Sequence, residues 1–120
     1  MKKRILVVDD DFSVRETLAD ILRSRDYEVV EASSGAEAVV NAGAGKYDCV
    51  IIDLRLPDTT GIEVIEKISC YVPKNKVIAI TGYASSDILA KTLEEAEFFL
   101  LLKPVDTEQM LAVVKKIIEQ

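Results

Sequence analysis

Five short apolar segments recur along the chain, and stretches with helical spacing separate them. The apolar segments are rich in Val, Ile, Leu and Phe; they are Arg4–Asp9, Glu28–Ala32, Asp48–Asp53, Lys76–Ile80 and Phe98–Leu102. They show little alternation of apolar and polar residues, which is typical of strands covered on both faces. The pattern therefore predicts five buried strands of a parallel sheet.

Apolar residues at helical spacing lie between several of these strands. Three sets are clear: Val14, Leu18, Ile21 and Leu22; Ile62, Ile65 and Ile68; and Met110, Val113, Val114 and Ile117. Ser34, Thr60 and Asp106 predict helix starts, because a Glu or Gln that can bond back follows each three residues later. The alternation of strands and helices predicts a doubly wound α/β fold, with residues 1–120 forming one domain.

Three further residues or segments set boundaries of the predicted helices. Asp11 is expected to be the N-cap of the first helix, ahead of any chemical role. The sequence Ala-Gly-Ala-Gly at 42–45 predicts the end of the second helix, and Pro73 interrupts the connection into the fourth strand.

Composition narrows the classes of function. The net charge is −6, and no basic stripe is present that would displace counterions from phosphates, so nucleic-acid binding is not expected. No apolar run approaches the roughly 20 residues that cross a bilayer. Cys49 and Cys70 lack metal-ligand spacing and the chain has no histidine, so neither zinc nor a disulfide framework is expected. The chain starts with the basic segment Met1–Arg4, but no signal-peptide pattern follows it, so we expect a cytoplasmic protein. Both thiols are then expected to be reduced, with Cys49 buried in a strand.

Polar residues follow the ends of four predicted strands. They are Asp9 and Asp10 after the first strand, Asp53 at the end of the third, Thr81 after the fourth, and Lys103 with Pro104 after the fifth. Parallel strands joined by right-handed crossovers end at one edge of their sheet, so these residues are expected to share one crevice. Crowded carboxylates raise one another's pKa, and a divalent cation that prefers oxygen ligands relieves that repulsion. The sequence therefore predicts a cation site there.

Each of these residues also has an ordinary structural interpretation. Asp53 could be a solvated loop residue, although the three apolar residues before it favour the crevice. Thr81 could simply end a strand ahead of a turn. Lys103 could be a surface lysine, although an ion pair with Asp53 is the expected outcome. Pro104 could terminate the strand or hold a cis peptide bond, and the sequence leaves both open.

In combination, these residues resemble the receiver domain of two-component response regulators, the CheY-like superfamily. The resemblance covers essentially the whole chain and rests on four motifs: Val-Val-Asp-Asp-Asp at 7–11, Asp-Leu-Arg-Leu-Pro-Asp at 53–58 with Gly61, Thr-Gly-Tyr-Ala at 81–84, and Lys103–Pro104. It implies a (βα)5 fold with a flavodoxin-like strand order 2-1-3-4-5. It also implies that Asp53 accepts a phosphoryl group from a histidine kinase or histidine phosphotransfer protein. The chain would then signal to a downstream effector protein or domain.

The resemblance assigns a role to each site residue. Mg²⁺ would be held by Asp10, Asp53 and the backbone carbonyl of Arg55, with Asp9 acting mostly through metal-bound water. Thr81 and Lys103 would contact phosphoryl oxygens.

Four further residues would modulate this chemistry; they are Gly82, Tyr83, Pro104 and Leu100. Gly82 would leave space for the phosphoryl group, and Tyr83 would influence the lifetime of the acyl phosphate together with Arg55. Such a chain catalyses its own phosphorylation and dephosphorylation and is not otherwise an enzyme.

The output surface departs from the family pattern. Leu100 stands where many receivers carry an aromatic switch residue, and Val105 stands where a phenylalanine often follows the proline. The approach to the fifth strand is Glu-Glu-Ala-Glu at 94–97 instead of a small, glycine-containing segment. None of these departures removes a residue assigned to phosphorylation. The family also offers homodimerisation through the fourth helix, fifth strand and fifth helix.

Three other functions compete with this interpretation. A pseudo-receiver would keep the fold and the acid pocket but signal without phosphorylation. A small hydrolase would use Asp53 as nucleophile, yet Arg55 stands where such an enzyme usually has a second acid. A flavin-binding protein is the weakest alternative, because acids, and not a phosphate-binding loop, follow the first strand.

Overall fold

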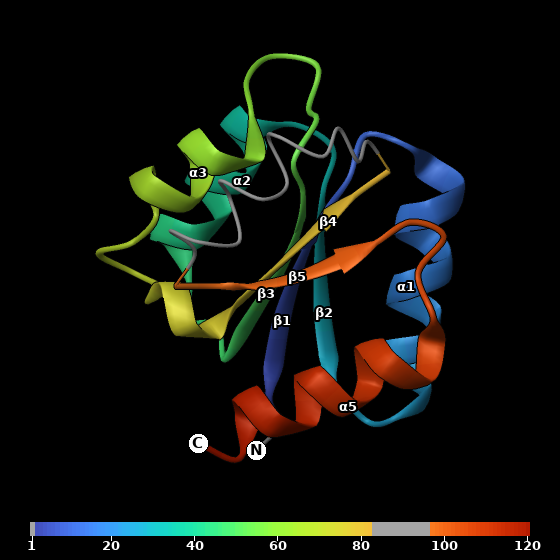
Figure 1. The fold of residues 1–120 in the computed structure, drawn as a ribbon. Coiled ribbons are helices and arrows are strands. Elements are labelled where there is room, and N and C mark those ends of the chain that lie inside the picture. The colour runs from blue at the N-terminus through green and yellow to red at the C-terminus, as the bar shows by residue number, and fades with distance from the viewer. Residues whose placement is uncertain (1, 83–96) are drawn as a thin grey trace.

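The centre of the molecule is a five-stranded parallel sheet (Figure 1). The computed structural model describes residues 2–82 and 97–120. The strands are β1 (Arg4–Val8), β2 (Glu28–Ala32), β3 (Cys49–Asp53), β4 (Val77–Thr81) and β5 (Phe99–Leu102), and their order in the sheet is β2-β1-β3-β4-β5. This arrangement confirms the predicted strands, to within one residue at each end, and the predicted strand order.

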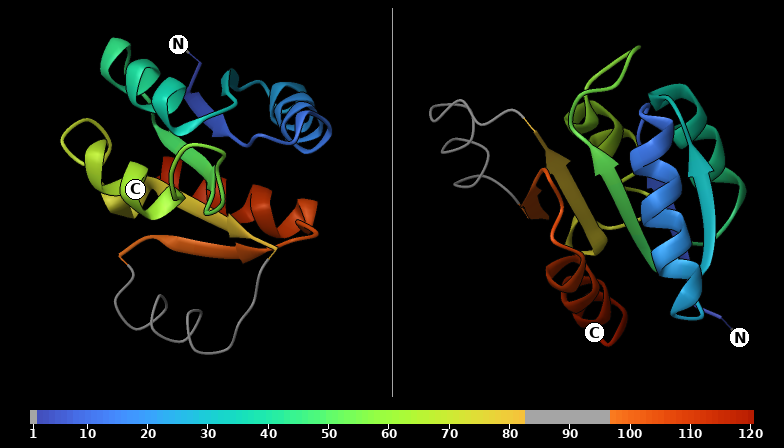
Figure 2. Two further views of the ribbon diagram at one scale, coloured as in Figure 1. Left: turned by 90° about the horizontal axis from the view of Figure 1, so that it is seen from above. Right: turned by 90° about the vertical axis from the view of Figure 1, so that its right-hand side faces the viewer.

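Helices cover both faces of the sheet (Figures 1 and 2). One face packs against α1 (Phe12–Ser24) and α5 (Thr107–Ile118), and the other packs against α2 (Gly35–Ala44) and α3 (Gly61–Lys67). A short 3-10 helix, η1 (Lys74–Lys76), leads into β4. The described part of the chain is therefore a three-layer α/β structure, as the doubly wound pattern predicted.

The side chains of β1 illustrate how the sheet is covered on both faces. Ile5 and Val7 belong to the apolar cluster with α1 and α5, whereas Leu6 and Val8 belong to the cluster with α2 and α3. All four are buried. Each such side chain contributes about 1.5–3 kcal/mol through its transfer from water. Burial on both faces explains why β1, β3 and β4 are almost continuously apolar, whereas the edge strand β2 carries Glu28 and Glu31.

Cys49 confirms the expected burial of a thiol within a strand. It is fully buried in β3, and burial raises the pKa of its thiol to about 12. Cys70 is exposed, and both thiols are free.

The four predicted helix starts carry side-chain caps, which confirms them. The cap oxygens accept a backbone N–H three residues on, in the pairs Asp11–Val14, Ser34–Glu37, Thr60–Glu63 and Asp106–Gln109. The returning contact differs from the expected capping box: Glu37 accepts from Ser33, and Glu63 from Thr59, each one residue before the cap. The second helix ends at Ala44, as predicted.

The strands finish at one edge of the sheet, which is where the polar residues gather. Asp53 pairs with Ile80, and Thr81 pairs with Leu102, so β3, β4 and β5 end within one residue of one another along the sheet. Among the residues described, no helix has the length and apolar character that a membrane crossing requires.

Candidate functional site

Three carboxylates meet at the C-terminal edge of the sheet. One oxygen each from Asp9, Asp10 and Asp53 lies within 4.8 Å of the other two. Asp9 is fully buried and Asp53 is 5% exposed, whereas Asp10 is open to solvent. The cause is topological, because β1 and β3 are adjacent parallel strands that end at the same level. The structure thus brings together the acids that the sequence placed in one crevice.

Lys103 supplies the positive charge of this acid pocket. Its Nζ lies 2.6 Å from Asp53 Oδ2 and 3.0 Å from Asp9 Oδ2. Its backbone N–H donates to the carbonyl of Thr81 at 2.8 Å, which fixes the turn after β5 against the end of β4. The predicted ion pair with Asp53 is confirmed, and the second pairing, with Asp9, was not foreseen.

Burial and charge oppose each other in the acid pocket. Burial raises the pKa of Asp9, and the hydrogen bond from the Asp11 amide and the Lys103 ammonium only partly offset that rise. Burial alone would lower the pKa of Lys103, but hydrogen bonds and attraction from Asp53 and Asp9 outweigh it, so the pKa is raised. The raised pKa keeps the lysine charged, whereas burial disfavours the charged form of Asp9.

The two buried carboxylates are oriented in the same way. Asp9 Oδ1 accepts a hydrogen bond from the backbone N–H of Asp11 at 2.9 Å. Asp53 Oδ1 accepts one from Arg55 N–H at 2.8 Å. In each case the bond to the residue two positions on directs the other oxygen, Oδ2, toward Lys103. Asp9 Oδ2 is buried with no well-aligned hydrogen-bond donor beyond this ion pair.

The loop from β3 to α3 carries the predicted backbone ligand, Arg55. The Leu54 N–H donates to the carbonyl of Ile80, and the Gly61 N–H donates to the carbonyl of Leu54, both at 2.9 Å. At Gly61, a Cβ would lie 2.5 Å from the backbone oxygen of Asp53. Only a glycine allows α3 to start this close to the Asp53 backbone.

Asp58 fastens the far side of this loop to α2. Its two carboxylate oxygens accept the backbone N–H groups of Gly35 and Ala36, each at 2.9 Å. These bonds hold the pKa of Asp58 below its ordinary value. Sequence reasoning missed this contact because it joins two elements more than twenty residues apart and no local pattern marks it.

The remaining predicted site residues lie at or just after the strand ends, apart from Leu100, which lies within β5, and Tyr83. Thr81 ends β4 and is 5% exposed. Gly82 follows it, and a Cβ there would make ordinary 3.6 Å contacts with the Lys103 side chain. The Lys103–Pro104 peptide bond is cis, which answers the question that the sequence left open. Leu100 is partly buried against the apolar cluster of α2 and α3. Tyr83 lies outside the described residues.

A groove of about 580 Å³ opens beside the acid pocket. It runs between α1 and the turn from β5 to α5, and its walls include Val14, Leu18, Lys103 and Pro104. Much of this lining is apolar, so the charged pocket adjoins a surface that can receive an apolar group.

Comparison with known proteins places these features in a family. The response regulator receiver domain family matches residues 5–115. Sporulation initiation phosphotransferase F from Bacillus subtilis is 27% identical over 116 residues, which are 97% of this chain and 94% of that protein. Transcriptional regulatory protein ZraR from Klebsiella oxytoca is 33% identical over 106 residues, 88% of this chain. The chain spans only 24% of that longer relative.

Solved structures give the same result. The CheY-like response regulator receiver domain protein from Methanospirillum hungatei superposes with a TM-score of 0.89 at 31% identity, covering 99% of this chain and 95% of that one. The receiver domain from the hybrid histidine kinase CckA superposes with a TM-score of 0.80 at 32% identity, covering 96% and 98%. The likeness thus extends over sequence and fold.

Proposed function

The chain belongs to the response regulator receiver domain family, and from this we propose that Asp53 accepts a phosphoryl group from a histidine kinase or histidine phosphotransfer protein. One observation carries the proposal. The Asp53 carboxylate is buried at the end of β3, held by the Arg55 N–H, and placed 2.6 Å from the Lys103 ammonium and within 4.8 Å of two further carboxylates. A carboxylate held in this way is suited to act as a nucleophile toward phosphorus.

The pocket has the donor set that Mg²⁺ prefers. All its negative groups are carboxylates, which offer oxygen atoms as metal ligands. One of these atoms, Asp9 Oδ2, is buried without a well-aligned hydrogen bond. Asp10, Asp53 and the backbone carbonyl of Arg55 would hold the ion, and Asp9 would act through a bound water. When bound, Mg²⁺ would neutralise charge on the acceptor and phosphoryl oxygens.

The protein groups would then perform the transfer as follows. The Asp53 carboxylate attacks phosphorus, its new O–P bond forms as the N–P bond of the phosphohistidine breaks, and the imidazole leaves with the bonding electron pair. Lys103 and the Thr81 hydroxyl stabilise phosphoryl oxygens on the acceptor. The product is an acyl phosphate on Asp53, and its hydrolysis returns the carboxylate. In this cycle the chain catalyses its own phosphorylation and dephosphorylation, and it acts as a signalling domain.

Phosphorylation would alter the protein by drawing Thr81 toward the new phosphoryl group. Such a contact shifts a two-state equilibrium by the difference in affinity between the states. Leu100 has no aromatic ring to couple to this movement, so the signal to the downstream effector would be carried by a different rearrangement of the surface around β5 and α5. We assign to Tyr83 an influence on acyl phosphate lifetime, to be tested by comparing autodephosphorylation of Tyr83→Ala and native chains.

Intact mass spectrometry tests the central proposal. The chain is incubated with acetyl phosphate or phosphoramidate, with and without Mg²⁺, beside Asp53→Asn and a control, Asp20→Asn, on the surface of α1. We expect one phosphoryl adduct that requires Mg²⁺, persists in the control and is lost in Asp53→Asn. A folded native chain that binds Mg²⁺ but gains no adduct would favour the pseudo-receiver, and sustained turnover of small phosphate esters would favour the hydrolase.

A further inference from the structure

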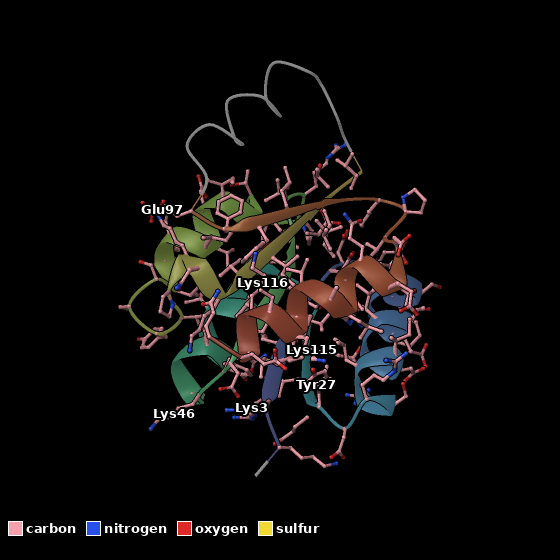
Figure 3. All side chains as sticks on the ribbon, turned by 60° about the horizontal axis from the view of Figure 1, so that its bottom comes forward. Lys3, Tyr27, Lys46, Glu97, Lys115 and Lys116 are labelled. Atoms are coloured by element: carbon pink, nitrogen blue, oxygen red, sulfur yellow. The ribbon has the colours of Figure 1, made fainter. Side chains whose placement is uncertain are left out.

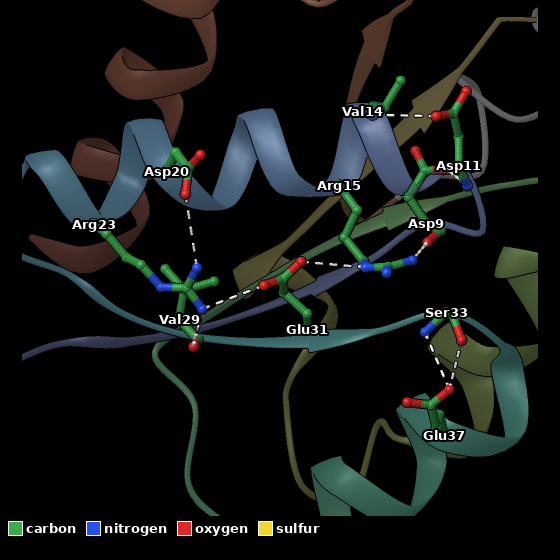
Figure 4. A network of polar contacts seen from close by, with 10 residues as sticks. All are labelled: Asp9, Asp11, Val14, Arg15, Asp20, Arg23, Val29, Glu31, Ser33 and Glu37. Carbon is green, nitrogen blue, oxygen red and sulfur yellow. Dashed lines mark hydrogen bonds and ion pairs between the residues drawn. The ribbon is translucent and has the colours of Figure 1, made fainter.

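Arg15 connects the acid pocket to the outer strand of the sheet. Its Nη1 donates to the backbone carbonyl of Asp9 at 2.8 Å, and its Nε lies 3.2 Å from Glu31 Oε1 (Figure 4). The Arg15 side chain is only 13% exposed. A largely buried arginine is tolerated in a protein when a carboxylate pairs with it and hydrogen bonds satisfy its N–H groups. The phosphoryl-transfer chemistry described above assigns it no role.

The bond from Arg15 acts on the peptide unit that joins two acids of the pocket. The carbonyl of Asp9 and the N–H of Asp10 belong to the same planar group, so fixing one fixes the other. Among the described residues, the Asp10 carboxylate receives no hydrogen bond and forms no ion pair. Its position is therefore set by its backbone, and Arg15 holds that backbone.

Glu31 holds Arg15 in turn, and a second arginine steadies Glu31. Arg23 Nη2 lies 3.3 Å from Glu31 Oε2 and also donates to the carbonyl of Val29 at 3.2 Å. Arg15 and Arg23 both project from α1 toward β2, but only Arg15 reaches Asp9 (Figure 4). The two arginines thus share one carboxylate and differ in their connection to the acid pocket.

We propose that Arg15 is a positioning residue for the metal site: it orients the Asp9–Asp10 peptide so that the Asp10 carboxylate faces the bound Mg²⁺, with Glu31 setting the arginine. The inference rests on the proposed Mg²⁺-dependent function. Groups that orient metal ligands from outside contribute substantially to affinity, commonly about 10-fold or more each. Metal affinity would then depend on a residue of β2 that touches neither the ion nor the phosphoryl group.

Calorimetric titration of the full chain with Mg²⁺ tests this inference, with Arg23→Ala as the matched control. We expect Arg15→Ala to bind Mg²⁺ about 10-fold more weakly than the native chain and Arg23→Ala to bind it with nearly native affinity. In the metal-free protein, the NMR amide signal of Asp10 should shift in Arg15→Ala and remain in place in Arg23→Ala. If Arg15→Ala does not fold, Glu31→Gln should show a smaller loss of affinity of the same kind.

Three outcomes would overturn the inference, and they are distinguishable. Native affinity in folded Arg15→Ala would remove the role of Arg15 alone. Equal losses of Mg²⁺ affinity in Arg15→Ala and Arg23→Ala would show that the contacts of the two arginines with Glu31 only stabilise the packing of α1 against β2. Failure of the native chain itself to bind Mg²⁺ would remove the proposed function and this inference together.

Discussion

The Lys103 ammonium lies 2.6 Å from Asp53 Oδ2, although 50 residues separate the two in the sequence. The same ammonium approaches Asp9 Oδ2, so one lysine serves both buried carboxylates of the pocket. Without it, two buried carboxylates would face each other with no positive group between them. Lys103 thus offsets the repulsion between the two buried carboxylates before any cation or phosphoryl group binds.

We expect Lys103→Ala to lower the free energy of unfolding of the metal-free chain by about 2 kcal/mol at neutral pH. The estimate lies below the roughly 3–5 kcal/mol for breaking a fully buried pair, because the lysine side chain is 24% exposed. The raised pKa of Lys103 means that its contribution is complete below the ordinary lysine value and is lost as the pH rises through the raised one. Urea unfolding measures the change.

Lys115→Ala is the matched control for that experiment. Lys115 is an exposed residue of α5 and does not belong to the acid pocket (Figure 3). Its removal should change stability by less than about 0.5 kcal/mol. Equal effects of the two lysine substitutions would show that the Lys103 pairings contribute nothing specific.

Asp10→Asn should make the chain more stable than the native chain without Mg²⁺ and less stable than it with Mg²⁺. Without the metal, the substitution removes one of three carboxylates within 4.8 Å, and the relief of repulsion should stabilise the chain by about 1 kcal/mol. With Mg²⁺ at 100 times its Kd, the native chain should gain about 2.7 kcal/mol, whereas the variant should gain far less. Thermal unfolding with MgCl₂ or with NaCl of equal ionic strength separates binding from screening. Parallel shifts in both proteins would contradict a role of Asp10 in metal binding.

The sequence predicts the acid pocket well because its position follows from topology. Once Asp9 and Asp53 end apolar strands of a parallel sheet, they must meet at one edge, whatever their side chains contact. Strand bounds are less predictable, because pairing between strands sets them. Thr81 extends β4 by pairing with Leu102, and Lys76 belongs to η1 through its bond to the Pro73 carbonyl.

Three contacts that the sequence did not predict join separate elements of the fold. The carboxylate of Asp58 binds the start of α2, Arg15 meets Glu31 across α1 and β2, and Lys103 reaches Asp9 as well as Asp53. Each depends on how two packed elements place their side chains, and neither residue of a pair marks the other in the sequence. Local patterns therefore predict where the acids lie but not what holds them.

Asp58→Asn should destabilise the chain at neutral pH, and the difference should disappear in acid. An asparagine offers one acceptor oxygen to the two N–H groups that now bond to Asp58. Because the pKa of Asp58 is lowered, its contribution is present above the ordinary value of 3.8 and is lost as the pH falls through the lowered value. Urea midpoints measured across this range check the prediction.

Glu16→Gln provides the control for that pH series. Glu16 is an exposed carboxylate of α1 that forms no hydrogen bond or ion pair with the described residues. Its substitution should leave the urea midpoint nearly unchanged at every pH. A pH-independent loss in Asp58→Asn would show that the lost shape, and not the charge, explains the effect.

Two glycine-to-alanine substitutions should have opposite effects. At Gly61 a Cβ would lie 2.5 Å from the Asp53 carbonyl oxygen and 2.8 Å from Leu54 Cα, and backbone atoms cannot yield as a flexible side chain does. At Gly43, inside α2, the nearest atoms belong to the Tyr71 ring at 3.5 Å, an ordinary contact. Gly61→Ala should therefore cost roughly 1–3 kcal/mol, whereas Gly43→Ala should stabilise by up to about 1 kcal/mol.

Of the two glycine substitutions, only Gly61→Ala should change the rate at which Asp53 is phosphorylated. The methyl group at position 61 must displace either the start of α3 or the loop that carries Asp53 and Arg55, so phosphorylation by acetyl phosphate should slow in Gly61→Ala. Gly43→Ala should be phosphorylated at the native rate, because Gly43 lies at the opposite end of α2 from Gly35 and Ala36, whose N–H groups bond to Asp58 of this loop. Since no described glycine has a positive φ, backbone conformation cannot explain the difference. A native rate in Gly61→Ala would show that the loop absorbs the methyl group without moving Asp53.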